Sequence, residues 1–148
     1  MKIIAENKKA YFDYEVLDRY EAGVELKGFE VKSAKNGRFN IVGAYVILRG
    51  NEAWLINSNI PPYQPKNTPP DYDSSRNRRL LLNRKEIKFL SGKLQEKGLT
   101  LLPLKIYIKN NLIKLELGLA RHKKEHDKRE AIKKREASKK IRATLKRE

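Results

Sequence analysis

Hydrophobic and polar residues alternate along several short stretches of the first 118 residues, a pattern typical of β-strands with one buried face. Turn-forming pairs separate some of these stretches, as at Gly50 and Asn51 and at Asn110 and Asn111. Gly43 interrupts one stretch and indicates a bulge or bend. The predicted strands are residues 11–20, 24–27, 39–48, 52–60, 99–109 and 112–118.

One segment has a helical period instead. Asn83 is a good N-cap residue, and Glu86 follows three positions later, where a capping box needs it. This pattern predicts a helix over residues 84–96, and a single helical turn is expected over residues 30–35. The apolar residues that recur at helical spacing are Ile87, Leu90 and Leu94.

About six short strands, one long flanking helix and a short helical turn predict a mainly β protein, either a closed barrel or a sandwich. Because the chain is basic and a helix is inserted among the strands, we favour an OB-type antiparallel β-barrel. We expect the barrel domain to span residues 1–118.

Residues 119–148 form a basic tail with thirteen Lys or Arg residues against five Asp or Glu residues, half of the whole-chain net charge of +16. Helix formers dominate the tail, but its apolar stripe is too thin to hold a helix on a core. We predict that the tail is disordered alone and helical when a polyanion neutralises it. A solvated tail that only aids solubility is the alternative.

The charge indicates a polyanionic partner, most simply nucleic acid. The tail lacks the bulky apolar face of a membrane-surface helix, so no membrane partner is expected. The chain contains no cysteine, which excludes disulfides and thiolate-bound metal. With neither a signal peptide nor an apolar run of membrane-spanning length, the protein is expected to be cytoplasmic.

Residues 61–79 hold five of the six prolines and predict a long irregular loop. The loop is either an ordinary flexible insertion or, because it carries Tyr and Arg, a surface that stacks on unpaired RNA bases.

No motif for an enzyme or a metal site is convincing. His122, Glu125 and His126 fit the H-x-x-E-H zinc pattern, but Lys123 and Lys124 stand between the histidines. Phosphate-binding glycine loops are absent. We therefore expect no catalytic residues, no metal and no cofactor. A generic RNA-binding protein and a small RNA-processing enzyme remain as alternatives to a specific adaptor.

Four blocks, in order along nearly the whole chain, together resemble the SsrA-binding protein family, SmpB, the protein partner of transfer-messenger RNA (tmRNA). Each is similar to a signature of that family. The blocks are YEAG at 20–23 with GFEVKSAK at 28–35, RLLLNRKEI at 79–87, GLTLLPLKIY at 98–107 and LGLARHKKEHDKR at 117–129.

The resemblance implies an OB-type barrel that binds the tRNA-like domain of tmRNA and delivers this RNA to stalled ribosomes. It implies that the tail enters the vacant message channel as a helix, at the decoding centre of the 16S ribosomal RNA. The nascent chain is then tagged for proteolysis. A monomer is expected in the free state.

The resemblance also assigns site residues. Those implied to bind tmRNA are Glu21, Leu81 and Asn83, with Lys114 a further contact and Glu30 and Lys32 added from the first block. Those implied to bind the ribosome are His126, Asp127, Lys128 and Arg129.

Three of these residues have a purely structural alternative. Leu81 could be core, Asn83 could only cap its helix, and Glu21 could only pair with a neighbouring Lys. The chain also departs from the family pattern at two positions. His122 replaces a usual Gly, so any bend there must suit His, and Ala34 replaces Leu, which predicts a smaller packing contact.

Overall fold

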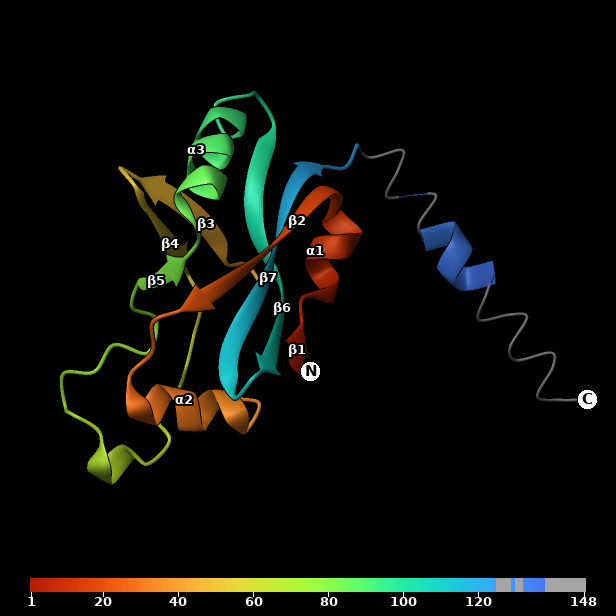
Figure 1. Ribbon diagram of the computed structural model, residues 1–148. Coiled ribbons are helices and arrows are strands. Elements are labelled where there is room, and N and C mark those ends of the chain that lie inside the picture. Colours follow the sequence, from red (N-terminus) through yellow and green to blue (C-terminus); the bar gives the residue numbers. More distant parts are fainter. Residues whose placement is uncertain (125–128, 130–131, 138–148) are drawn as a thin grey trace, which may run out of the picture.

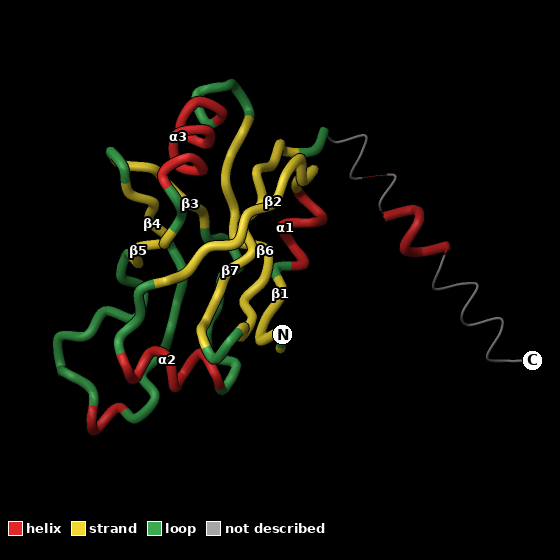
Figure 2. The backbone as a smooth tube through the Cα atoms, viewed as in Figure 1, coloured by secondary structure: helices red, strands yellow, loops and turns green. Residues whose placement is uncertain are grey.

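A computed structural model describes residues 1–124, 129 and 132–137. Residues 1–124 contain seven strands and three α-helices (Figure 1; Figure 2). The helices are α1 (Lys8–Asp13), α2 (Gly28–Lys35) and α3 (Arg84–Lys93), and a 3₁₀ turn covers Pro65–Asn67. The strands are β1 (Lys2–Glu6), β2 (Tyr14–Val24), β3 (Tyr45–Arg49), β4 (Glu52–Ile56), β5 (Arg78–Leu81), β6 (Leu99–Lys109) and β7 (Leu112–His122).

The strands form one antiparallel sheet that closes on itself. The order β6-β3-β4-β5-β2-β7 returns to β6, because β6 also pairs with β7. Strand β1 adds to the edge of β6 beside the single pairing of β3 with β6. Six strands therefore close the ring, and the predicted OB-type barrel with flanking helices is confirmed.

The β6–β7 hairpin is the longest part of the barrel. Its turn residues Asn110 and Asn111 have φ values of 52° and 63°, as a tight two-residue hairpin turn requires. Strand β6 has the predicted bounds. Strand β7 continues to His122, beyond the predicted end at Gly118, because β2 pairs with it as far as Tyr14 opposite His122. His122 is thus in extended strand, and the bend considered for this position does not occur there.

Several other predicted bounds were wrong for local reasons. Asn7 accepts a hydrogen bond from the Ala10 N–H and starts α1, so β2 begins at Tyr14 rather than at residue 11. The predicted break at residues 21–23 is absent, because Gly23 pairs with both neighbouring strands. Strand β4 ends at Ile56, since Asn57 has a φ of 66°.

The two faces of the barrel wall carry different residues. The main core inside the ring includes Leu55, Leu101, Ile106 and Leu115, all fully buried. A second cluster lies outside the wall, where α1 covers the end of the hairpin. It consists of Ala10, Leu102, Leu104 and Ala120. Among the residues that the structure describes, Leu81, Lys109 and Lys114 of the outer wall lie outside this cluster.

The helices α2 and α3 lie at opposite ends of the barrel (Figure 1). The predicted capping box of α3 is confirmed, with Asn83 Oδ1 accepting from the Glu86 N–H at 2.8 Å. The helix ends at Lys93, earlier than predicted. In α2, Ala34 is fully buried at the position where the family usually has Leu.

Candidate nucleic-acid interface

Three of the residues assigned to tmRNA binding meet on the outer face of the barrel. Strand β2 lies between β5 and β7, and Gly23 is paired with Leu81 on one side and Lys114 on the other. Because side chains alternate along a strand, Glu21 faces the same way as Gly23. We call Glu21, Leu81 and Lys114 the β2 patch.

The missing side chain of Gly23 shapes this patch. A Cβ atom there would lie 3.3 Å from Leu81 Cβ and Cδ1, so the Leu81 side chain lies across β2. A hollow of about 220 Å³ is lined by Gly23, Leu81 and Lys114, among others. Leu81 is 48% exposed. It is therefore not a core residue, and it offers an apolar contact to a partner.

The Glu21 carboxylate is held by two residues of β6. The Tyr107 hydroxyl donates to Oε2 at 2.6 Å, and Lys109 Nζ donates to Oε2 at 3.2 Å. The hydrogen bond from Tyr107 is the main cause that lowers the pKa of Glu21, and Lys109 and Lys114 add to it against a smaller effect of burial. The pairing with a lysine that was considered as an alternative role for Glu21 is thus present, and Glu21 is charged at neutral pH.

Further charged pairs continue from the β2 patch along the outer face. Arg19 Nη1 contacts Glu116 Oε1 at 2.8 Å, and Lys105 Nζ lies 3.9 Å from Glu116 Oε2. Each carboxylate holds a basic side chain in a defined position at the surface. Such spaced cations suit a phosphate backbone.

Asn83 comes two residues after Leu81 in the chain and is the N-cap residue of α3. Its Oδ1 caps the helix, but its amide group makes no hydrogen bond among the residues that the structure describes. The residue is exposed. The capping role and a contact from the amide to RNA can therefore coexist.

Glu30 has no exposed surface and lies outside the β2 patch. Its carboxylate accepts from Arg76, Arg78 and the Tyr72 hydroxyl, and from the Lys27 N–H. Burial alone would raise the pKa of Glu30, but the hydrogen bonds from Arg76, Lys27 and Arg78 outweigh it and lower the pKa to about 2. The observed role of Glu30 is structural, and we leave it out of the proposed RNA surface.

The proline-rich loop is anchored by this buried cluster. Tyr72 donates to the Ile60 carbonyl at 2.8 Å, and Ser33 donates to the Pro61 carbonyl at 2.7 Å. Arg78 is fully buried, so its guanidinium cannot stack on bases as considered from the sequence. Lys32 is exposed on α2, and its ammonium lies 6.0 Å from the Tyr63 ring centroid.

The sequence did not identify Tyr107, Lys109 or Arg19 as part of this surface. The alternation of Lys105, Tyr107 and Lys109 in β6 was the available signal, since it places all three on one face. Glu21, the partner of Tyr107 and Lys109, is 86 residues from Tyr107, and only the closed sheet brings the two together.

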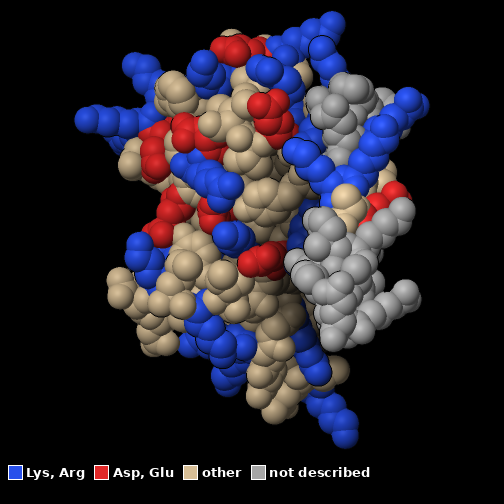
Figure 3. All heavy atoms as spheres, turned by 90° about the vertical axis from the view of Figure 1, so that its right-hand side faces the viewer, with Lys and Arg blue, Asp and Glu red and all other residues tan. Residues whose placement is uncertain are grey.

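The structure describes only part of the tail. Three of the four residues assigned to the ribosome, His126, Asp127 and Lys128, lie outside the described residues. Arg129 is exposed, and residues 132–137 are helical. The Lys123 N–H donates to the Asp13 carbonyl at 2.9 Å, so the chain leaves the barrel next to α1. Figure 3 shows Lys and Arg side chains scattered over this side of the molecule, with Asp and Glu among them.

Comparisons with known proteins show which family this chain resembles. A family model described as "SmpB protein" matches residues 4–147. The SsrA-binding protein of Carboxydothermus hydrogenoformans is 50% identical over 144 residues, covering 97% of this chain and 96% of the relative. That of Gloeothece citriformis is 48% identical over 146 residues, covering 99% and 94%.

A solved structure described as "tmRNA-SmpB: a journey to the center of the bacterial ribosome" contains a similar chain. Its TM-score is 0.68 at 43% identity, covering 86% of this chain and 93% of that one. Within the described residues, no helix is long and apolar enough to cross a membrane.

Proposed function

This chain belongs to the SmpB protein family, and from that premise we propose that it is an RNA-binding adaptor for tmRNA in trans-translation. The barrel binds the tRNA-like domain of tmRNA, and the complex is delivered to ribosomes stalled during translation. The observation that carries this proposal is the β2 patch. Glu21, Leu81 and Lys114 come from three strands and converge on the outer wall of the barrel.

The chemistry of the β2 patch suits a structured RNA. Lys114, Lys109 and Arg19 can contact phosphates, while half-exposed Leu81 can contact a sugar or a base. The charged carboxylate of Glu21 can accept from a 2′-hydroxyl or from a base amino group. A fixed acceptor among cations favours particular RNA geometry over an arbitrary polyanion, because it repels phosphate.

The tail residues His126, Asp127, Lys128 and Arg129 are proposed to act on the ribosome. In this proposal Lys128 and Arg129 bind phosphates of the 16S ribosomal RNA in the decoding centre and message channel, and His126 stacks on a base. The barrel and the tail then have separate tasks. We further propose that the protein acts without catalysis, as a monomer when free, in the cytoplasm.

The direct test is to purify the protein from its native host at moderate salt and to sequence the RNA bound to it. We expect one dominant RNA with a tRNA-like end and an internal reading frame. A broad mixture of tRNA and ribosomal fragments would instead support a generic RNA-binding protein.

A pair of variants tests the division of labour. Glu21→Ala combined with Asn83→Ala should weaken binding to the tRNA-like domain about tenfold or more, since polar contacts to RNA are lost. Replacing Asp127, Lys128 and Arg129 by Ala should preserve that binding and abolish tagging of nascent chains on stalled ribosomes. Unchanged affinity in the first variant would show that the β2 patch is the wrong surface.

A further inference from the structure

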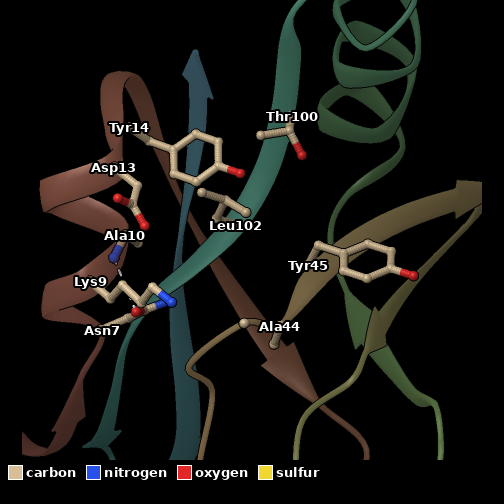
Figure 4. Close-up of a pocket in the computed structure, with 10 residues that line it drawn as sticks. Asn7, Lys9, Ala10, Asp13, Tyr14, Ala44, Tyr45, Thr100 and Leu102 are labelled. Carbon is tan, nitrogen blue, oxygen red and sulfur yellow. Dashed lines mark hydrogen bonds between the residues drawn. The ribbon is translucent and has the colours of Figure 1, made fainter. Parts of the chain in front are cut away.

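A second hollow lies over β6, between α1 and β3, and none of the three residues of the β2 patch lines it. Figure 4 shows Tyr14 on the α1 side and Tyr45 on the β3 side, with Leu102 and Ala44 between them. The hollow has a volume of about 310 Å³. That is the size at which small-molecule pockets begin, roughly 300 Å³. We call it the tyrosine hollow.

Both walls of the tyrosine hollow are held in place by hydrogen bonds. On the α1 side, Asn7 is buried and its Nδ2 donates to the Pro103 carbonyl at 3.0 Å, while its N–H donates to the Leu104 carbonyl at 2.8 Å. On the other side, Gly43 has a φ of 79°, and its carbonyl accepts from Asn57 Nδ2 at 3.3 Å. The hollow is therefore formed before any ligand arrives.

The lining suits a flat aromatic ligand. Tyr45 is 42% exposed, and Tyr14 is partly exposed and fixed by an edge-on contact with His122, with ring centroids 5.0 Å apart. Leu102 supplies an apolar floor. The hydroxyls of Tyr14, Tyr45 and Thr100 make no hydrogen bond among the described residues, so they can bond to the edges of a base.

The surroundings of the hollow favour a nucleic acid as the source of that ligand. Lys9 lines the mouth, and Lys8 is exposed next to it on α1. Asp13 is the acidic lining residue. The chain carries a net charge of +16, so phosphates linked to a base in the hollow would meet complementary charge.

We propose that the tyrosine hollow is a binding site for one unpaired nucleobase, which inserts beside Tyr45 and Tyr14 while Lys9 contacts an adjacent phosphate. This inference rests on the proposed RNA-binding function and adds a second RNA contact at the point where the tail leaves the barrel. The base belongs either to tmRNA or to ribosomal RNA, which share the same chemistry.

Hexa-adenylate and its abasic analogue are suitable probes, because they carry the same phosphates and differ only in the bases. We expect wild-type protein to bind hexa-adenylate at least about fivefold tighter than the abasic strand, the lower end for one stacked base. Amide NMR signals of Ala44 and Thr100 should shift with hexa-adenylate alone.

Tyr45→Ala should abolish the preference for hexa-adenylate over the abasic strand, whereas Tyr45→Phe should keep it. Tyr63→Ala is the matched control, since Tyr63 is also exposed, at 36%, but lies on the proline-rich loop. Tyr45→Ala removes no charge, so the salt dependence of binding should be unchanged, whereas Lys9→Ala should reduce the salt slope by about one phosphate. Hexa-adenylate binding that Tyr45→Ala leaves intact, or unshifted Ala44 and Thr100 signals, would overturn the inference.

The two RNA sources are separated by measuring Tyr45→Ala against the tRNA-like domain and against small ribosomal subunits. If Tyr45→Ala weakens binding to only one of these two partners, that partner supplies the base. If it weakens binding to neither, the proposed role of the hollow is overturned. Failure of the proposed function is a different result. It appears as no preference for the tRNA-like domain over bulk tRNA in wild-type protein, whatever Tyr45 does.

Discussion

At the residue scale, the charged groups on the outer face are positioned by partners from other strands. Glu21 illustrates this, because its carboxylate is oriented by Tyr107, which is only 4% exposed. Tyr107 does not need to touch RNA to matter. By fixing Glu21 and, through it, Lys109, it sets the spacing of charges that an RNA would meet.

Tyr107→Phe tests this coupling. The variant loses one hydroxyl and should fold, with the free energy of unfolding reduced by about 1 kcal/mol. Affinity for the tRNA-like domain should fall severalfold, because Glu21 is no longer fixed. In a double-mutant cycle with Glu21→Gln the two losses should not add. Fully additive losses in filter binding would mean that Tyr107 does not position Glu21.

Glu30 is expected to control stability rather than binding. Glu30→Gln leaves Arg76 and Arg78 without a carboxylate, and removing one partner of a buried ion pair costs about 3–5 kcal/mol. Urea unfolding at pH 7 measures this loss. Glu25→Gln is the control, because the Glu25–Arg79 pair is exposed and should contribute less than about 1 kcal/mol.

The same carboxylate predicts a pH dependence. The pKa of Glu30 in the folded protein is lowered to about 2 from a usual value of 4.5, so its contribution is complete above pH 4.5 and is lost as the pH falls towards 2. Wild-type protein should therefore lose more stability than Glu30→Gln between about pH 4.5 and 2. Parallel stability curves for the two proteins across this range would contradict the assignment.

At the element scale, α3 begins at a residue with two possible tasks. Asn83 caps the helix, and its amide group faces solvent next to the β2 patch. A capping residue with an unused donor can stabilise the helix and bind RNA with different atoms. The sequence pattern predicted the cap. Because the start of the helix lies close to Leu81, the capping residue can also contact RNA bound at the β2 patch.

Substitutions at Asn83 can separate these tasks. Asn83→Ala should lower the free energy of unfolding by about 1 kcal/mol and should weaken RNA binding, since both the cap and the amide are lost. Asn83→Asp keeps a good cap but removes the donor, so thermal stability should be retained while RNA affinity falls. If the Asp variant binds RNA as well as wild type, the amide is not a contact.

At the scale of the whole molecule, the border between barrel and tail lies further along the chain than hydrophobic patterning suggests. Leu119 and Ala120 are buried, at 3% and 0% exposure, and β7 pairs with β2 as far as His122. The barrel therefore needs residues that, by charge alone, look like the beginning of the tail.

Two truncations test this border. A chain ending at Lys124 should retain the melting temperature of the full protein within a few degrees and should still bind the tRNA-like domain. A chain ending at Gly118 should be destabilised by several kcal/mol, because it loses two buried side chains and the last pairs of β7. Calorimetry compares the two, and equal stability would show that the barrel ends at Gly118.

The sequence by itself determined the class of the fold, the β6–β7 hairpin, the capping box of α3 and the family. These depend on interactions between near neighbours in the chain or on blocks of residues in a fixed order. Side-chain alternation, a cap three residues from its partner and a pair of turn-forming asparagines can all be identified along a short stretch of sequence.

Only the tertiary structure decided which residues share a surface. Gly23, Leu81 and Lys114 are far apart in the chain, and closure of the sheet places them side by side. The tertiary structure also buries Glu30 against Arg76 and Arg78 of the proline-rich loop. From composition alone, that loop looked exposed. Strand pairing and ion pairs between distant residues leave no periodic signal in the sequence. The β2 patch and the tyrosine hollow can therefore be identified only from the closed barrel.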